Sequence, residues 1–541
     1  MIKNIINTSI LDFSEKFIDN NPVTFYKIKV FDNLNKKNWE IERRFNDFYN
    51  LFTDLNTLFK DYNMKNFPSK SIKKINNKEV LENRKNLLDK FLEFNVSKIE
   101  ILFSKPMIDF LDIKNNIFEI FEYLTNIFIS YDYKQKFEIN DMQYIKEKNF
   151  LFFIGNDNNL ITKVNKVNKS FIDTLKFWKK DIKNDKEIKL GSSNFLYLNF
   201  NKNSINTNSN TEIYENTDNN INNISNNNII IKLIWQKLYN ERPTCLFYEE
   251  NNNNFYVAFF SGKIFCYSFT EQNTIKFILK IDNNISKITG LYMDNLLNNV
   301  FTVDVQKYFF AHDITFNQNY TKIKVSSYPY NNLRFSHDLY FLTNDGGEIE
   351  IYDSKFFPPK FIKSYKSLCE GKNNITDIFI NDKINLCICS SQGNIACFDF
   401  NNNNKDKKDE KVDEEIIQTK EKNINNKKDD DIIKEKFYFN VKYNLTSITY
   451  DNKNNVFILG DNEGRIILCD YIKGNIISLW KGHEKCINKL ILIQENRILI
   501  SCGNDSKINF WKLPNYYINK YIDDFYQKIS LNNIIINNPQ V

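Results

Sequence analysis

The sequence has little of several features that mark well-known functional classes. None of its nine cysteines belongs to a CxxC pair, so the spacing typical of a zinc site is missing. The 73 basic residues nearly balance the 67 acidic ones, and the formal net charge of +6 is too small for a general nucleic-acid binder. The sequence has no phosphate-binding loop, metal-ligand cluster or catalytic pair. It therefore predicts a protein that is not an enzyme, binds no nucleic acid and needs no metal or cofactor.

Long apolar runs are also missing. The N-terminal segment MIKNIINTSILDFSEKF contains Asp12 and Glu15, where a signal peptide needs an uninterrupted apolar core, and no later stretch approaches about 18 apolar residues. We expect a cytoplasmic protein that contacts membranes only peripherally. The cysteines lie singly in apolar, β-rich runs such as INLCICSSQGNIACFDF at 384–400, which favours buried, reduced thiols.

The length of 541 residues predicts more than one globular unit, because a single core rarely grows so large. With 42% hydrophobic residues, 48 Phe and 29 Tyr, the chain has enough apolar surface for large cores. Two stretches of low complexity interrupt it, an Asn-rich segment at 201–228 and a charged segment at 401–436. Neither can bury enough apolar surface to offset the loss of chain entropy, so we expect both to be solvated insertions.

Residues 116–515 contain a repeated pattern of a β-rich run, a turn with Gly or Asn, and a strand. Taking the third residue of each turn–strand unit as a marker, successive markers are separated by 44, 41, 46 and 42 residues, and the two wider gaps contain the insertions. A period of about 40 to 45 residues predicts the blades of a β-propeller, and the number of units predicts seven blades. The units are GKIFCYSF from Gly262, QKYFFAHDI from Gln306, GEIEIYDS from Gly347, GNIACFDF from Gly393, GRIILCDY from Gly464, SKINFWKL from Ser506 and a weaker copy, NNLITKV, from Asn158.

The last unit, GHEKCINKLILIQENRILISCGNDSKINFWKL, resembles a WD40 repeat, with Gly482 and His483 before its first strand and Trp511 on its third. Ser501 and Asp505 fall where that family places a strand hydroxyl and a turn aspartate. The resemblance implies a structural hydrogen-bond network in which Asp505 accepts from His483, His483 bonds to Ser501, and Ser501 accepts from the Trp511 indole. Because no nucleophile elbow is present, we do not interpret this Ser, His and Asp as a hydrolase triad.

Residues 1–115 follow a different pattern, with strands near Ile10, 23–31 and 38–44 followed by two stretches of helical periodicity. Strands followed by helices predict a separate α+β domain. The whole chain is thus predicted to be multidomain, an α+β domain followed by an all-β propeller and a tail at 516–541.

Four segments of this first domain resemble the PX (phox homology) family in order and spacing. They are IERRFNDFYNLFTDL at 41–55, FPSK at 67–70, ENRKNLLDKFLEF at 82–94 and KPMIDFLDI at 105–113. The resemblance implies that Arg44 holds the 3-phosphate of a phosphoinositide, Phe45 stacks beneath the inositol ring, Lys70 meets the 1-phosphate and Arg84 bonds the 4- and 5-hydroxyls. These residue types suit those roles, because the planar guanidinium binds phosphate through two hydrogen bonds and lysine supplies a point charge.

The segment after Lys70 alternates apolar and basic residues at Ile72, Lys73, Lys74 and Ile75. In PX domains the corresponding loop dips into the bilayer, and apolar tips flanked by lysine suit an anionic membrane surface. Of the prolines of the family's turn, this chain keeps Pro68.

The two resemblances together favour an adaptor that binds phosphatidylinositol 3-phosphate on endosomal or vesicular membranes and holds protein partners on its propeller. A second hypothesis is a soluble WD40 adaptor, for example a ubiquitin-ligase substrate receptor, whose PX-like domain binds protein instead of lipid. The identity of the propeller's partner, the organelle and the oligomeric state do not follow from the sequence.

Overall fold

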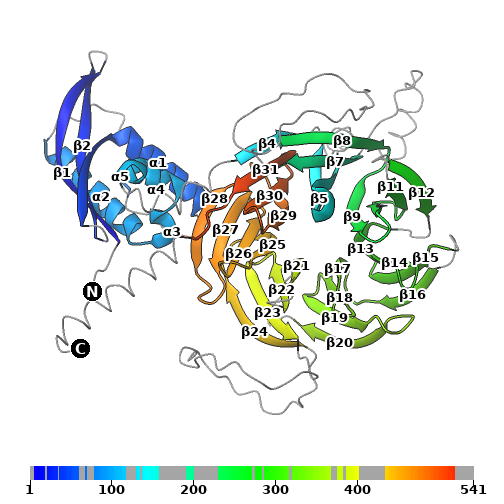
Figure 1. Cartoon of the computed structure of the whole chain (residues 1–541). Coiled ribbons are helices and arrows are strands. Elements are labelled where there is room, and N and C mark those ends of the chain that lie inside the picture. Colours follow the sequence, from blue (N-terminus) through cyan, green and yellow to red (C-terminus); the bar gives the residue numbers. More distant parts are fainter. Residues whose placement is uncertain are drawn as a thin grey trace, which may run out of the picture.

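A computed structural model gives the structure of the chain (Figure 1). An N-terminal domain of strands and helices lies against the rim of a ring of sheets. The structure describes residues 5–18, 21–33, 36–59, 67–69, 78–116, 130–134, 137–156, 191–199, 230–270, 275–282, 286–315, 320–366, 374–381, 385–400 and 433–517.

The N-terminal domain is an antiparallel three-stranded sheet covered by helices. Its strands, in the order β1-β2-β3, are β1 (Ile6–Ile18), β2 (Asn21–Asp32) and β3 (Lys37–Arg44). Its helices are α1 (Phe45–Leu58), α2 (Lys78–Val96), α3 (Ile99–Leu102), α4 (Lys105–Phe110) and α5 (Ile113–Asn116).

The core of this domain forms where the apolar faces of the helices meet the sheet. Phe48 and Leu55 of α1 are fully buried, and the ring of Phe48 packs edge-on against Tyr26 of β2 at 5.9 Å and against Phe110 of α4 at 4.9 Å. The indole of Trp39 donates to the Leu111 carbonyl at 2.9 Å. The predicted α+β fold of this domain is confirmed.

The rest of the described chain forms seven four-stranded antiparallel sheets arranged as a ring, which we number as blades (Figure 1). Blade 1 is β5 (Glu138–Ile145), β6 (Phe150–Asn156), β7 (Gly191–Asn199) and β8 (Ile230–Tyr239), with a 3-10 turn at Lys146–Lys148. Blade 2 is β9 (Pro243–Glu249), β10 (Asn254–Phe259), β11 (Ile264–Phe269) and β12 (Ile275–Ile281). Blade 3 is β13 (Ile288–Asp294), β14 (Asn299–Asp304), β15 (Tyr308–Asp313) and β16 (Tyr320–Val325).

Blade 4 is β17 (Tyr330–Ser336), β18 (Leu339–Asn344), β19 (Glu348–Asp353) and β20 (Lys360–Lys366). Blade 5 is β21 (Ile375–Asn381), β22 (Asn385–Ser390), β23 (Asn394–Phe400) and β24 (Ile433–Asn440). Blade 6 is β25 (Leu445–Asp451), β26 (Val456–Asp461), β27 (Arg465–Asp470) and β28 (Ile476–Lys481). Blade 7 is β29 (Ile487–Ile493), β30 (Ile498–Gly503), β31 (Lys507–Lys512) and β4 (Ser130–Lys134). The predicted all-β propeller is confirmed.

Six of the seven predicted turn–strand units are the third strands of blades 2 to 7, and the seventh prediction was wrong. The third strand of blade 1 is β7, which starts at Gly191, whereas the predicted copy NNLITKV lies outside the described residues. The Asn-rich turn favoured NNLITKV, but β6 pairs with the run GSSNFLYLN.

The two predicted insertions both separate a third strand from a fourth. Residues 201–228 fall between β7 and β8, outside the described residues. The predicted segment 401–436 is too long by four residues, because β24 begins at Ile433 and pairs with β23 from Phe400 onward. The predicted tail at 516–541 also begins too early, because Tyr517 is buried and lies beneath the guanidinium of Arg497 at 5.5 Å.

The ring is closed by a strand from the N-terminal side of the propeller. Blade 7 takes β29, β30 and β31 from the C-terminal region, and its outermost strand is β4, which precedes blade 1 in the sequence. Trp511 of β31 pairs with Ser130 of β4. Joining the two ends of the propeller in one sheet removes the open edges that would otherwise remain at the seam.

A β-bulge near the start of each innermost strand links neighbouring blades. Every innermost strand shifts register there, and the extra residue is Thr or Asn in all seven blades: Asn140, Thr244, Thr289, Asn331, Thr376, Thr446 and Asn488. In five blades its side chain donates to the carbonyl of the first or second residue of the next blade's innermost strand; Thr289, for example, reaches the Tyr330 carbonyl at 2.7 Å and Asn488 the Ile139 carbonyl at 2.6 Å. Each of these bonds joins a side chain of one blade to the backbone of the next.

Blade 7 contains the hydrogen-bond network predicted from the sequence. His483 Nδ1 lies 2.9 Å from Asp505 Oδ1, its Nε2 lies 2.7 Å from Ser501 Oγ, and the Trp511 indole donates to the same Oγ at 2.9 Å. Burial raises the pKa of Asp505. The His483 ring and two backbone N–H groups together lower this pKa by more than burial raises it, so the pKa is below its usual value. The network ties the first turn of the blade to its third strand.

The N-terminal domain docks on the outermost strand of blade 6. Helix α3 and helix α1 both contact β28, and Ile101 and Leu102 share one hydrophobic cluster with Leu479 and Trp480. Arg465 crosses this interface, because its Nη1 donates to the carbonyl of Leu58, the last residue of α1, at 3.4 Å.

Arg465 is itself buried beside a buried carboxylate. Its Nε lies 2.5 Å from Asp461 Oδ2, and its guanidinium stacks over the Tyr443 ring at 4.6 Å. Burial raises the pKa of Asp461, and the charge of Arg465 acts against that rise.

Replacing Asp505 with Ala is expected to destabilise blade 7 by about 1 to 3 kcal/mol, because His483 would lose a buried hydrogen-bond partner. Asp505→Asn, which keeps one acceptor oxygen, is the matched control and should cost less. Denaturant unfolding measures both variants. An unchanged free energy of unfolding for Asp505→Ala would contradict a structural role for the network.

Arg465→Met is expected to cost about 3 to 5 kcal/mol of stability, because Asp461 would be left as a buried charge without a partner and its pKa would rise further. The double variant Arg465→Met, Asp461→Asn removes both charges and should recover part of that loss. Denaturant unfolding gives the free energy of unfolding of both variants. If the double variant loses as much stability as Arg465→Met alone, the pairing of Arg465 with Asp461 is contradicted.

Candidate functional site

The candidate headgroup site lies where β3 passes into α1. The pattern IERRF ends the strand at Arg44 and starts the helix at Phe45. Asp47 caps the helix by accepting from the Arg44 backbone N–H at 2.9 Å. The tight strand-to-helix passage therefore holds Arg44 and Phe45 side by side at the first turn of α1.

The two neighbouring arginines of this segment have different roles. Arg43 Nε donates to the Phe110 carbonyl at 2.9 Å, and its guanidinium stacks on the Phe110 ring at 5.5 Å, so it connects β3 to α4. Arg44 is exposed, and its Nε lies 3.3 Å from Asp47 Oδ1. Among the described residues neither Nη nitrogen of Arg44 has a hydrogen-bond partner, which leaves the outer edge of the guanidinium open to a ligand.

Helix α2 brings Arg84 to the same place. Its guanidinium lies over the Phe45 ring, 4.4 Å from the centroid, a cation–π contact between residues 39 positions apart. Arg84 also faces Tyr26, whose pKa burial raises and the charge of Arg84 lowers in part. An inositol ring that stacks on Phe45 would have to share that face with Arg84 or displace it.

An aromatic cluster supports Phe45 from below. Phe67 lies 5.9 Å from Phe45 and stacks on Phe52 at 4.4 Å with an interplanar angle of 16°. Pro68 is buried and Ser69 is exposed. The FPSK turn is thereby anchored by its first two residues beneath the candidate site.

The structure thus brings three of the four predicted headgroup residues together: Arg44, Phe45 and Arg84. Lys70 and the predicted insertion residues Ile72, Lys73, Lys74 and Ile75 lie outside the described residues. Sequence reasoning missed the proximity of Tyr26 to this site, for which the only signal was its central position in the second strand.

The described part of the chain contains no group of three or more His, Cys, Asp or Glu side chains arranged to hold a metal ion. No helix in it is both long and apolar enough to cross a bilayer. Its eight cysteines are free thiols, buried except for the half-buried Cys486, and burial raises the pKa of the Cys502 thiol well above its usual value.

Comparison with known proteins agrees with both halves of this architecture. Pre-mRNA-processing factor 19 of Caenorhabditis elegans is 36% identical over 61 residues, which are 11% of this chain and 12% of that protein. The WD repeat-containing protein 55 homolog of Dictyostelium discoideum is 22% identical over 215 residues, 37% of this chain and 50% of that protein. The chain therefore spans half or less of the length of these curated relatives.

Among solved structures, Raptor of Chaetomium thermophilum is similar with a TM-score of 0.43 and 10% identity, over 71% of this chain and 28% of that one. A family model of the PX domain matches residues 33–114, a range that includes Arg44, Phe45 and Arg84. Residues 33–114 are a PX domain, and the chain joins this domain to a seven-bladed β-propeller of the WD40 type.

Proposed function

We propose that this protein is a peripheral membrane adaptor that binds phosphatidylinositol 3-phosphate on endosomal or vesicular membranes and holds protein partners on its propeller. PX domains and WD40 propellers are binding modules, which favours an adaptor over an enzyme. The observation that carries the proposal is that Arg44 lies beside Phe45. The outer edge of the Arg44 guanidinium is open, and the guanidinium of Arg84 lies over the Phe45 ring. The same proposal places the boundary between the two domains at residue 115, and the propeller domain extends through Tyr517.

The chemistry of these side chains matches a phosphorylated inositol. The Nη edge of Arg44 presents two parallel N–H donors, which suits a phosphate group. Phe45 offers an apolar face, and Arg84 adds donors for hydroxyl groups beside it. Lys70 follows the anchored turn Phe67–Ser69 directly in sequence, and we assign it to the phosphate that joins the inositol to the lipid.

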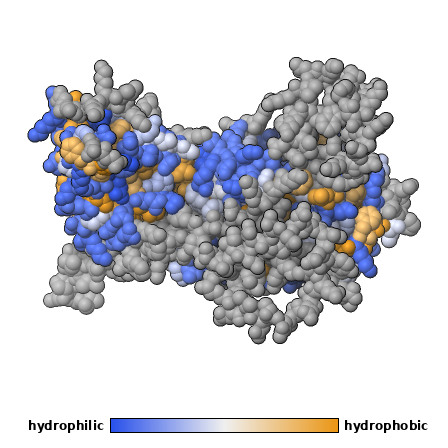
Figure 2. All heavy atoms as spheres, turned by 90° about the horizontal axis from the view of Figure 1, so that it is seen from above, coloured by the Kyte–Doolittle hydropathy of each residue, from blue (hydrophilic) through white to orange (hydrophobic). Residues whose placement is uncertain are grey.

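The β1–β2 hairpin supplies a second feature that fits a membrane surface. Arg44 pairs with Phe25, and Phe25 pairs with Ser14, so both strands of the hairpin continue four residues beyond the end of β3, about 13 Å. Phe17, in this extension, has 76% of its surface exposed, and Ile18 is also exposed. Figure 2 shows hydrophobic patches among the hydrophilic surface of this domain. An apolar tip projecting past the headgroup site can enter the lipid interface.

The soluble-adaptor hypothesis requires the same domain to bind protein. A protein ligand would not need a phosphate beside Arg44, so the headgroup experiments below also decide between the two hypotheses.

Arg44→Ala is expected to weaken binding of a soluble short-chain phosphatidylinositol 3-phosphate about tenfold to a hundredfold, because a bidentate, charge-assisted contact is lost. Arg44→Lys should restore little, since lysine lacks the planar fork. Lys105→Ala, which removes an exposed cation on α4, is the matched control. Calorimetry measures all three variants, and parental affinity in Arg44→Ala would favour the soluble adaptor.

Replacing Ile72 and Ile75 together with Asp is expected to weaken sedimentation with vesicles while leaving calorimetric binding of the soluble headgroup nearly unchanged, because these residues are assigned to the bilayer and not to the pocket. A parallel loss in both assays would show that the loop forms part of the pocket instead.

Phe17→Asp is also expected to weaken sedimentation with vesicles while leaving the affinity for the soluble headgroup unchanged. Leu296→Asp is its control, because Leu296 is 96% exposed but lies on the propeller. If both substitutions reduce sedimentation equally, the hairpin has no particular role at the membrane.

A further inference from the structure

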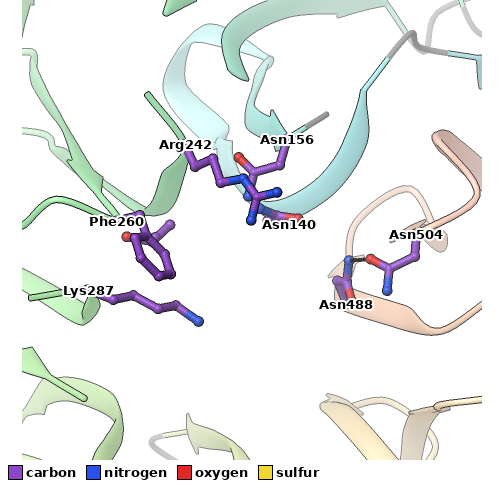
Figure 3. A pocket seen from close by; sticks show the side chains of 8 residues that line it. Asn140, Asn156, Arg242, Phe260, Lys287, Asn488 and Asn504 are labelled. Carbon is purple, nitrogen blue, oxygen red and sulfur yellow. Dashed lines mark hydrogen bonds between the residues drawn. The ribbon is translucent and has the colours of Figure 1, made fainter. Parts of the chain in front are cut away.

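The propeller has a cavity of about 360 Å³ at one end of its axis. Its walls are the first residues of innermost strands with the residues just before them, and the ends of second strands with the turns that follow, from blades 1, 2, 3 and 7 (Figure 3). The lining residues are Asn140, Asn156, Arg242, Thr244, Phe260, Lys287, Asn488 and Asn504. None of these eight side chains takes part in the headgroup site.

The blades can be aligned on the residue two positions before the bulge of the innermost strand, which we call the rim position. In each of blades 2 to 7 its carbonyl accepts from the same turn; Phe260 N donates to Arg242 O at 2.8 Å and Val305 N to Lys287 O at 3.1 Å. The equivalent backbone hydrogen bond identifies the rim positions of blades 4 to 7 as Pro329, Asn374, Asn444 and Cys486. In blade 1 the rim position is Glu138, which pairs with Asn156. Two adjacent blades therefore carry a cation where four others carry a neutral residue.

The charges of Arg242 and Lys287 are not balanced within the described residues. Glu138, the acidic rim residue, forms an ion pair with Lys485 at 3.3 Å. Glu241, next to Arg242 in sequence, pairs with Lys263 and accepts from Ser261. No ion pair of Arg242 or Lys287 occurs in the described chain, and Figure 3 shows both side chains reaching into the cavity from the same side.

Further along the innermost strands, opposite charges lie close together. Lys489 lies 3.0 Å from Asp377, and Arg334 lies 3.7 Å from the same carboxylate. Asp141 lies among them and accepts from the backbone N–H groups of Met142 and Leu246. Two carboxylates and two cations are matched there, so the unmatched positive charges near the cavity are those of Arg242 and Lys287.

Two polar atoms in the wall are left without partners in the described chain. Arg242 Nε is a buried donor without an acceptor, and Asn156 Oδ1 is a buried acceptor without a donor, on a residue only 8% exposed. On the opposite wall Asn488 donates to Asn504 Oδ1 at 2.6 Å, which fixes both amides. Buried polar groups of this kind are normally hydrogen-bonded, so this part of the wall holds one donor and one acceptor whose hydrogen bonds are unmade in the described chain.

We infer that this cavity binds an acidic peptide segment of a protein partner, with a carboxylate or phosphate held by Arg242 and Lys287. A free phosphate ion would use only the two cations, whereas a peptide fills more of the cavity and brings further side chains to its wall. Phe260, 56% exposed beside the two cations, offers an apolar contact for a neighbouring side chain. This inference rests on the propeller as the protein-binding half of the proposed adaptor and is independent of the lipid site.

The test uses the full chain and a fluorescein-labelled pentapeptide of glutamate, with a glutamine pentapeptide as the neutral probe. Fluorescence anisotropy is expected to show binding of the glutamate peptide alone and at least a tenfold loss of affinity in Arg242→Ala, Lys287→Ala. Lys355→Ala, which removes an exposed lysine from the turn between β19 and β20, should bind like the parent. Undiminished binding in the double variant, or no binding to the parent, would overturn the inference.

Two further arms identify the ligand class and guard against misfolding. If inorganic phosphate displaces the labelled peptide as well as unlabelled peptide does, the peptide assignment is wrong. It is also wrong if the double variant loses binding to phosphatidylserine vesicles but keeps binding to the peptide. In the unmodified protein, the glutamate peptide should protect Lys287 but not Lys355 from acetylation, and equal protection would overturn it independently of any variant. Binding to soluble phosphatidylinositol 3-phosphate should be unaffected throughout, so failure here is distinguishable from failure of the lipid proposal.

Discussion

Closure of the propeller ring is the constraint on which the rest of this structure depends. A single four-stranded blade cannot bury both of its faces, so each is stable only between two neighbours. The side chains at the bulges form hydrogen bonds from one blade to the next, including the step from blade 7 to blade 1 through Asn488. Blade 7 is complete only with β4, the strand between the PX domain and blade 1. The closing strand therefore also fixes where the PX domain leaves the ring.

Helix α1 connects the candidate lipid site to the propeller. It begins at Phe45 in the headgroup site and ends at Leu58, whose carbonyl accepts from Arg465 of blade 6. Its 14 residues span about 21 Å, so the headgroup site lies at the far end of the helix from the interface. The buried pair Arg465–Asp461 and the shared hydrophobic cluster favour one fixed orientation of the two domains. Both candidate binding surfaces thus belong to one continuous body.

The sequence predicted those features that local patterns encode. The repeated turn–strand unit predicts the third strands of six blades. Local periodicity predicts both the step from strand to helix at Arg44 and Phe45 and the second helix, which contains Arg84. The closing strand could not be found in this way, since SYDYK at 130–134 pairs with a strand more than 370 positions later. Blade 1 was misread because its third strand follows a long interruption. Local patterns also do not single out Arg242 and Lys287, because only the position of the bulges makes these two residues equivalent in adjacent blades.

The central claim is that the PX domain directs the whole chain to membranes that carry a 3-phosphorylated inositol lipid. The most direct measurement is flotation of the full-length protein with vesicles of matched charge that contain phosphatidylinositol 3-phosphate, phosphatidylinositol 4-phosphate or phosphatidylserine alone. The account predicts that the protein floats with the first kind of vesicle and stays in the soluble fraction with the other two. Equal flotation with all three kinds, or with none, would contradict it.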